Sequence, residues 1–167
     1  ESPMTAKISN NVISLVKKER RPADEKWGKA VMDIGFSIIP SLLLRAQDRL
    51  GLNPTQLTIV LQLVDHWWES ERKPYPSKSA LAQRLGIKER QLQRHIAELE
   101  KAGLIQREPR YHAGGKGQTS NIYHLDGLVK RLQELEPEFR EVKEESKRRR
   151  AAVERRKLLK PVSTNSA

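Results

Sequence analysis

The stretch from Ser77 to Ile105 constrains the fold more than any other part of this 167-residue chain. It reads SKSALAQRLGIKERQLQRHIAELEKAGLI, and it contains two runs of residues in which the apolar positions have helical spacing. Gly86, between the two runs, permits the sharp reversal that a pair of crossing helices needs. The pattern therefore predicts two amphipathic helices joined by a tight turn. The first helix should begin at the N-cap Ser77 and should point Ala80, Leu81 and Leu85 inward.

The second helix, expected from Lys88 to Ala102, has an apolar face and a face of long hydrogen-bond donors. Leu92, Ile96 and Leu99 lie at i, i+4 and i+7, so they share a face that must be buried. The opposite side carries Arg90, Arg94 and Lys101, with Gln91 and Gln93 on its flanks. Arg can bind guanine edges, Gln can bind adenine edges, and Lys or Arg can bind phosphate. This face suits the major groove of DNA, whereas a plain helical hairpin is the alternative.

After Gly103 the spacing of apolar residues changes from helical to strand-like. The runs LIQREPRY and NIYHL are short and compatible with strands. The segment HAGGKGQTS between them has the glycine content and polarity of a hairpin tip. We therefore expect an antiparallel β-hairpin with a basic tip around Lys116.

Before Ser77 the sequence predicts an extended segment and two further helices. KWGKAVMDIGFSIIP, residues 26–40, suits a short strand or extended segment, and SLLLRAQDRLG predicts a compact helix that ends at Gly51. In NPTQLTIVLQLVDHWW, Asn53 is the expected N-cap and Pro54 the first residue of a buried central helix. At least one of Trp67 and Trp68 should lie in the core, because adjacent side chains on a helix point about 100° apart.

A third region of helical spacing follows Asp126. Its seam alternates three- and four-residue steps and consists of Leu125, Leu128, Leu132, Leu135, Phe139 and Val142. The seam is brief and contains Pro137. From Ser146 the seam positions become polar, and SKRRRAAVERRKLLK is either a basic helix or a disordered arm, solvated or bound to DNA. We expect a long C-terminal helix whose seam is one possible dimer contact.

Composition narrows the classes of partner. Lys and Arg outnumber Asp and Glu by 32 to 21, which gives a formal charge of +11 and favours a polyanion. Nucleic acid is the first candidate, an anionic membrane surface is the second, and a solubility role for the charge is the alternative.

Without cysteine no disulfide or thiolate metal site can form, and we expect a reducing cytoplasm. No apolar run approaches the roughly 20 residues of a membrane span.

No pattern in the sequence predicts catalysis, a metal or a cofactor. The histidines at positions 66, 95, 112 and 124 lack metal-ligand spacing, and no Ser lies in a nucleophile elbow. GGKG at residues 114–117 lacks the spacing and the following Ser or Thr of a phosphate-binding loop. We therefore expect a protein that is not an enzyme and needs no cofactor.

The segment YPSKSALAQRLGIKERQLQRHIAELEKAGLIQREPR, followed by GGKGQTSNIYHL, resembles the winged helix-turn-helix proteins of bacteria, their plasmids and phages. The upstream GFSIIPSLLLRAQDRLGLNPTQLTIVLQLVDHWW is similar to the lead-in of mobile-element regulators and of the amino-terminal domains of phage replication organisers. The resemblance spans about residues 35–128. It implies a mainly α fold with a small β-hairpin wing, extended here by the long C-terminal helix. Many relatives have Ser or Thr where Lys88 and Gln91 stand, so their base preference does not transfer.

The resemblance also implies which residues contact DNA. The helix from Lys88 would enter the major groove, and the wing around Lys116 would reach phosphates or the adjacent minor groove. The expected contacts of the recognition helix are Lys88, Arg90, Gln91, Gln93, Arg94 and His95. The expected wing and backbone contacts are Ser77, Lys78, Arg110, Lys116, Gln118 and Thr119. For Arg107, which lies in a strand, we expect only a solvated edge charge.

The sequence thus predicts a sequence-specific regulator of transcription that binds double-stranded DNA. We expect a dimeric repressor of a plasmid, phage or other mobile element, located in a bacterial cytoplasm at the nucleoid. One alternative is a plasmid or phage replication-initiation or maintenance protein that binds origin repeats and recruits machinery through its tails. A second alternative is a sequence-independent architectural binder. The expected organisation is a flexible basic segment (1–25), a DNA-binding domain (26–128), a C-terminal helix or basic arm (129–160) and a disordered tail (161–167).

Overall fold

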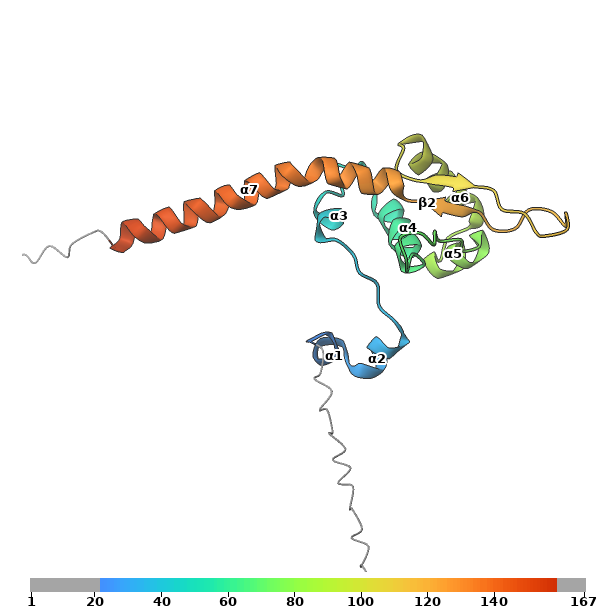
Figure 1. Ribbon diagram of the computed structural model, residues 1–167, viewed down its shortest axis with the longest axis horizontal. Helices are drawn as coiled ribbons and strands as arrows, with labels where there is room; N and C mark the ends of the chain where they lie inside the picture. Colours follow the sequence, from blue (N-terminus) through green and yellow to red (C-terminus); the bar gives the residue numbers. More distant parts are fainter. Residues whose placement is uncertain (1–21, 159–167) are drawn as a thin grey trace, which may run out of the picture. The chain divides into compact units, whose positions relative to one another are not determined.

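The computed structural model describes residues 22–158, which divide into two compact units, residues 22–36 and residues 37–158 (Figure 1). The basic segment expected at 1–25 lies mostly outside the described residues, and the tail expected at 161–167 lies wholly outside them. The second unit begins at Ser37, eleven residues after the start we expected for the DNA-binding domain.

The first unit contains two short helices, α1 (Pro22–Trp27) and α2 (Lys29–Ile34). The strand or extended segment expected over 26–40 is therefore wrong for α2, whereas residues 35–40 have no regular structure. An ion pair between Lys29 and Asp33, one helical turn apart, stabilises the helix. Gly28 and Gly35 flank α2 at φ values of 87° and 137°, which end the helical backbone on both sides.

Two helices open the second unit. α3 (Ser41–Arg45) is shorter than expected, because turns replace the helix from Ala46 to Gly51. α4 (Pro54–Asp65) begins as predicted. The side chain of Asn53 accepts a hydrogen bond from the Gln56 amide at 2.8 Å, and the Gln56 side chain accepts one from the Asn53 amide at 3.2 Å. This reciprocal cap satisfies two amide donors near the start of the helix.

The predicted helix pair is present as α5 (Lys78–Leu85) and α6 (Glu89–Lys101). The Ser77 hydroxyl caps α5 by accepting a hydrogen bond from the Ala80 amide at 3.1 Å. Gly86 ends α5 in the left-handed conformation, with φ of 64°. The chain reverses there without strain, because glycine has no Cβ.

The buried faces of the two helices match the predictions except at one position. Leu81 is buried and Leu85 is half-buried, but Ala80 is exposed and Ala82 is buried in its place. The inward arc of α5 is therefore centred closer to residue 82 than we expected. On α6, the three seam residues Leu92, Ile96 and Leu99 are buried as predicted.

The hairpin also forms where the sequence predicts it. β1 (Gln106–Glu108) and β2 (Ile122–His124) are antiparallel, with Arg107 opposite Tyr123. An isolated bridge between Tyr111 and Gln118 continues the pairing toward the tip. The amide of Tyr123 donates to the carbonyl of Pro74 at 2.9 Å, which ties β2 to the loop before α5.

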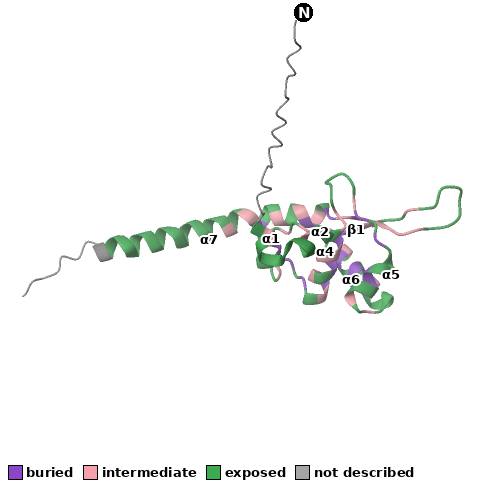
Figure 2. Ribbon diagram, turned by 90° about the horizontal axis from the view of Figure 1, so that it is seen from below, coloured by how far each residue is buried: buried purple, intermediate pink, exposed green. Residues whose placement is uncertain are grey.

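One hydrophobic core joins these elements, and Figure 2 shows its buried residues gathered on α4, α6 and the neighbouring turns. Trp67 is half-buried against this core, whereas Trp68 is 78% exposed. The prediction that at least one of the two lies in the core is therefore met only in part, because Trp67 packs against the core without being fully buried. Both residues follow the end of α4, so the helical geometry that we used for the prediction does not apply to them.

The long C-terminal helix α7 (Asp126–Leu158) starts directly after β2 and includes Pro137. Its first turn lies against the turn that follows α6, where the Leu128 amide donates to the Leu104 carbonyl at 3.0 Å. A Cβ on Gly127 would lie 1.9 Å from the carbonyl oxygen of Gly103. Only glycine therefore lets α7 approach this closely.

The seam of α7 packs mainly inside its own unit. Leu125, Leu128 and Leu135 are buried, and Leu132 and Phe139 are half-buried against the same core. We expected the seam from Leu125 to Val142 as one possible dimer contact, and this is wrong for Leu125 to Phe139, because those side chains are already covered. From Arg140 to Arg156 every residue is exposed (Figure 2), and the basic segment after Ser146 is helical up to Leu158.

The fold class is the one that the sequence predicts. The second unit is a mainly α winged helix-turn-helix, with α5 and α6 as the helix pair, the β1–β2 hairpin as the wing, and α7 as the C-terminal extension. Within residues 22–158, no helix has both the length and the apolarity needed to cross a membrane.

Candidate nucleic-acid interface

The exposed face of α6 gathers the cations that the sequence assigned to it. Lys88, Arg90, Gln91 and Arg94 line one shallow hollow on this face. All four are exposed, while the opposite face of the helix is buried in the core. The buried seam thus fixes the rotation of α6 and so the direction in which the four long side chains point.

Two of the three acidic side chains of α6 are engaged with other elements, and the third, Glu89, is exposed in its first turn. Glu98 accepts a hydrogen bond from the side chain of Gln56 on α4 at 2.8 Å, and Glu100 binds Arg107 on β1. Within residues 22–158, no carboxylate oxygen lies within 4 Å of the charged nitrogens of Lys88, Arg90 or Arg94. The outward charge of α6 is therefore positive and available to a polyanion.

Two other residues expected on the recognition face lie in different environments. Gln93 is half-buried at the flank of the helix. His95 is only 8% exposed, so the expectation that it contacts bases or phosphates is wrong. It lies three residues after Leu92 and four before Leu99, which places it within the buried arc. Its Nδ1 has no hydrogen-bond partner in the described structure and lies 3.7 Å from a Glu98 oxygen.

Ser77 and Lys78 lie at the N-terminus of α5, and both are exposed. The Ser77 hydroxyl oxygen already accepts the capping hydrogen bond, but its proton remains able to donate. Amides of the first helical turn lie at this end of α5, where Lys78 adds a positive charge. The pair has the donors and the positive charge that a phosphate group requires.

The wing presents Lys116 at its tip. Gly114, Gly115 and Gly117 surround it with φ between 73° and 92°, so the tip is a turn that side chains would strain. Lys116 and Gln118 are exposed, whereas Thr119 is half-buried and its amide donates to the Arg110 carbonyl at 2.8 Å. The Gln118 side chain donates to Asn121 at 2.9 Å. Among the expected wing contacts, Lys116 is thus the charged residue at the tip.

Arg110 lies at the base of the wing and is engaged with its own chain. Its guanidinium carbon is 4.3 Å from the centre of the Tyr75 ring, and one of its terminal nitrogens donates to the Ser120 hydroxyl at 2.9 Å. Its Nε is buried without a partner in the described structure. These contacts hold the segment after β1, the segment before β2 and the loop before α5 together, so Arg110 positions the wing.

Arg107 is not the solvated edge charge that we expected. Its Nε donates to Glu100 at 2.9 Å, and its backbone amide donates to the other Glu100 oxygen at 2.9 Å. Hydrogen bonds from the Arg107 side chain hold the pKa of Glu100 below its usual range. The pair fastens the end of α6 to the first strand of the wing.

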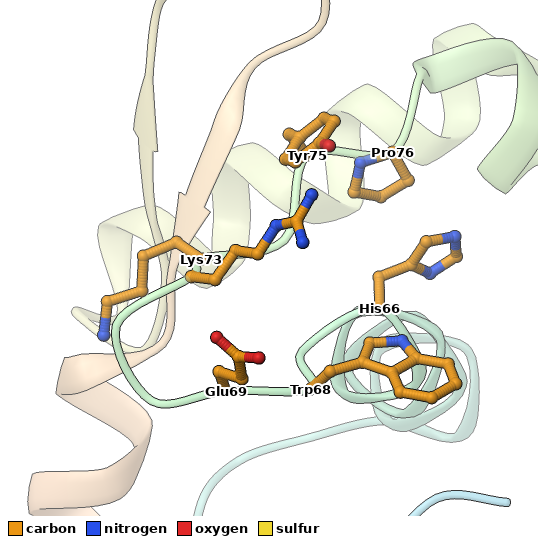
Figure 3. Close-up of a pocket in the computed structure, with 7 residues that line it drawn as sticks. His66, Trp68, Glu69, Lys73, Tyr75 and Pro76 are labelled. Carbon is orange, nitrogen blue, oxygen red and sulfur yellow. The ribbon is translucent and has the colours of Figure 1, made fainter.

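A second hollow lies beside the end of α4 (Figure 3), and it shares no lining residue with the hollow on α6. Trp68, Tyr75 and Pro76 give it apolar walls, while His66, Glu69 and Arg72 give it polar ones. Lys73 contributes only its stem, because its ammonium binds Asp126 at 3.0 Å and lies 5.1 Å from the centre of the Trp67 ring. With an acid and a cation side by side, this hollow lacks the uniformly positive charge of the α6 face.

Two tyrosines were missed from the sequence. Tyr75 supports Arg110, and Tyr111 is 67% exposed on the wing and paired with Gln118. Strand alternation could have indicated that Tyr111 faces outward, but nothing local connects Tyr75 with a residue 35 positions away.

Among the described side chains, no group of three or more His, Cys, Asp or Glu residues is arranged to hold a metal ion.

Comparison with known proteins identifies one matching family. Residues 50–105, from the end of the turn after α3 to the start of the wing, match the family described as a helix-turn-helix domain. The match includes α4, α5 and α6. It therefore includes the cationic face of α6, which consists of Lys88, Arg90, Gln91 and Arg94. No curated protein sequence matches the chain.

Several solved structures are similar in part. The N-terminal domain of the DnaD protein from Geobacillus kaustophilus HTA426 is 19% identical, with a TM-score of 0.47 over 77% of this chain and 98% of that domain. MarR is 18% identical, with a TM-score of 0.39 over 83% and 95% of the two chains. A possible transcriptional regulator from Methanosarcina mazei Go1 is also 18% identical, with a TM-score of 0.40 over 62% and 82%.

Proposed function

We propose that this protein is a sequence-specific transcriptional regulator that binds double-stranded DNA, with α6 in the major groove and the wing on the adjacent backbone or minor groove. One observation supports this most strongly. Lys88, Arg90, Gln91 and Arg94 lie together on the exposed face of a helix-turn-helix domain, and the three cations have no carboxylate partner among the described residues. Nothing in the described part of the chain competes with DNA for them.

The chemistry of the side chains assigns their roles. Arg90, Gln91 and Arg94 are the proposed base contacts, because Arg and Gln can each make paired hydrogen bonds to base edges. Lys88 and Gln93, nearer the edges of the face, are proposed to contact bases or phosphates. Ser77, Lys78, Lys116, Gln118 and Thr119 are the proposed backbone contacts, and Arg110 is proposed to position the wing rather than to bind phosphate.

The proposed outcome of binding is repression. A dimer would occupy an inverted repeat in a promoter and exclude the transcription machinery. We propose a plasmid, phage or other mobile element as the setting, and the support for this is the sequence resemblance from about residue 35 to residue 128. The proposed unit of DNA binding is residues 37–128, with α7 beyond it left for contacts between subunits.

Selection of binding sites from a random pool of duplex DNA, followed by footprinting of the chosen sites, tests the proposal. We expect enrichment of one inverted repeat whose halves are about one helical turn, or a multiple of it, apart. Protection should cover both halves at the same protein concentration. Recovery of no common sequence at physiological salt would remove the claim of specificity and leave a sequence-independent binder.

The same experiment separates the alternative functions. Head-to-tail repeats with filament-like cooperative protection would favour a replication-initiation or maintenance protein, which assembles on arrays of sites. A specificity ratio near one, together with a salt dependence that reflects roughly six or more released counterions, would favour an architectural binder. Only a symmetric site with a high specificity ratio supports the regulator.

A further inference from the structure

The exposed half of α7 has an uneven distribution of charge. Residues 126–145 contain seven acidic and four basic side chains, whereas residues 146–158 contain seven basic and one acidic. Every residue from Arg140 to Arg156 is exposed, with Val142 at 65% and Val153 at 54%. Most of the stability of a helix in a protein comes from tertiary packing, and among the described residues the core extends along α7 only to Phe139. The exposed half is therefore a surface that another helix could stabilise.

Four charged residues form an ordered line along this surface. Glu138 and Glu145 are seven residues apart, Arg149 follows four residues later, and Arg156 another seven. At about 100° per residue, all four point within about 40° of one another, so they share one side of the helix. By the same count Val142 and Val153 lie directly beside this line. The surface thus has two acids, then two cations, flanked by two exposed valines.

We propose that a second copy of this chain binds here, with the two α7 helices antiparallel. An antiparallel arrangement centred midway between Glu145 and Arg149 places Glu145 opposite the second copy's Arg149. The same register places Glu138 opposite its Arg156, because both pairs are symmetric about the same point. It also brings Val142 level with the second copy's Val153 to within one residue, about 1.5 Å along the helix. One register therefore satisfies both the charges and the apolar side chains.

The present partners of these charges do not prevent the pairing. Glu138 binds Arg49 at 2.9 Å and Glu145 binds Arg149 within the helix, but all four side chains are at least half exposed. Exposed ion pairs contribute little and exchange readily. Across an antiparallel interface each carboxylate could keep its present cation and gain a second one.

A second copy fits this surface better than DNA does. DNA would be attracted by the segment after Ser146 but repelled by the acidic segment before it, whereas a second α7 uses both. The inference deepens the proposed function, because it specifies how the proposed dimer forms. It does not depend on α6 binding DNA, so the two claims can fail separately.

The antiparallel orientation of the two α7 helices is tested by disulfide cross-linking. The chain has no cysteine, so each single-cysteine variant can form a disulfide only through the introduced residue. We expect Val142→Cys alone and Val153→Cys alone to give little disulfide-linked dimer on mild oxidation. An equal mixture of the two variants should give a linked heterodimer, because a disulfide needs Cα atoms about 4.4–6.8 Å apart. Linkage in either variant alone would indicate parallel helices, and no linkage in the mixture would also overturn the proposal.

The contribution of the four charged residues to dimer formation is tested by sedimentation velocity without DNA. Glu138→Lys with Glu145→Lys makes the line entirely basic, and Arg149→Glu with Arg156→Glu makes it entirely acidic. Each double variant alone should raise the dimer dissociation constant about tenfold or more, and mixing them should restore association. Glu144→Lys with Glu154→Lys is the matched control, because both residues are exposed on the other side of α7, and it should leave the constant unchanged.

Circular dichroism of each variant checks that α7 remains helical. A wild-type chain that is monomeric at concentrations where it binds its selected DNA site would contradict the inference and leave the DNA-binding proposal standing. A dimer that dissociates equally in the control and in the charge-reversed variants would also contradict it. A dimer with the expected cross-links but no preference for any DNA sequence would support the inference while rejecting the proposed function.

Discussion

Arg110 stacks on Tyr75, with its guanidinium carbon 4.3 Å from the centre of the ring. This contact joins the base of the wing to the loop that leads into the helix pair. A second link, from the Tyr123 amide to the Pro74 carbonyl, lies next to it. The position of the wing relative to the helix pair is therefore set by the contact between Tyr75 and Arg110 as well as by the Arg107–Glu100 pair at the end of α6.

Replacing Tyr75 by Ala should loosen the wing without unfolding the domain. A cation over an aromatic ring contributes about 0.5–1 kcal/mol at a partly exposed site, so we expect a stability loss of that order. Proteolysis near Lys116 should become faster, and DNA affinity should fall alike for all sequences. Tyr75→Phe keeps the ring and should behave as wild type. Equal effects of the Ala and Phe variants would show that the stacking has no such role.

Arg94→Ala should relax recognition at one base position and cost about 1–3 kcal/mol of binding to the selected site. The loss on random DNA should be smaller, because random DNA provides no matching base edge. Competition binding with single-base variants of the site measures this. If affinity for selected and random DNA falls equally, Arg94 contacts only the backbone.

Leu92→Ala changes the buried face of α6, opposite the face that Arg94→Ala changes. Leu92 is buried in the core, and truncating a buried Leu costs roughly 2–5 kcal/mol. We expect a clear fall in the free energy of unfolding, measured with urea, and a loss of binding only in proportion to the unfolded fraction. Normal stability together with lost binding would contradict the assignment of this face to the core.

Lys116→Ala should weaken binding to all sequences by a similar factor. The slope of log affinity against log salt concentration should become shallower by about one unit, because one phosphate contact is lost. Lys116→Arg keeps the charge and should keep the slope. An unchanged slope in the Ala variant would place the wing tip away from the DNA backbone.

Glu100→Gln should reduce stability near neutral pH and have little effect in acid. Hydrogen bonds from Arg107 lower the pKa of Glu100 from its ordinary value of 4.5. The lowered pKa stabilises the folded protein above the ordinary value, and this stabilisation is lost as the pH falls through the folded-state pKa. The free energies of unfolding of wild type and Glu100→Gln, measured with urea from neutral to acid pH, should therefore converge in acid. A difference between wild type and variant that does not depend on pH would contradict the role of the charge.

Gly127→Ala should destabilise the junction between α6 and α7. The added Cβ would meet the Gly103 carbonyl at 1.9 Å, so one of the two backbones must shift, at a cost of about 1–3 kcal/mol. Lys130→Ala, at an exposed position of the same helix, is the control and should change the thermal midpoint little. Equal thermal midpoints for the two variants would show that α7 is not held at this distance.

The features that the sequence predicted correctly are mostly local. The caps at Asn53 and Ser77, the turn at Gly86 and the seam of α6 each depend on side chains within a few residues of one another. Such signals do not require knowledge of the rest of the fold. They were sufficient to place the helix pair and the cationic face of α6.

The errors concern features that depend on distant parts of the chain or on the width of the buried arc. Ala82 rather than Ala80 lies in the core, and the α7 seam up to Phe139 is covered by its own unit rather than by a partner. Arg107 finds Glu100 only when the strand returns past the end of α6. His95 is different, because its spacing from Leu92 and Leu99 already indicated burial.

The central claim is that the exposed side chains of α6 read a DNA sequence. Its most direct test is an electrophoretic shift of the wild-type chain and of Arg90→Ala with Arg94→Ala, on DNA from upstream of its own coding sequence and on random DNA of equal length. At physiological salt, we expect the wild type to bind the upstream DNA about a thousandfold more tightly or better, and the double variant to lose most of that ratio. Equal wild-type affinity for the two DNAs would contradict the claim.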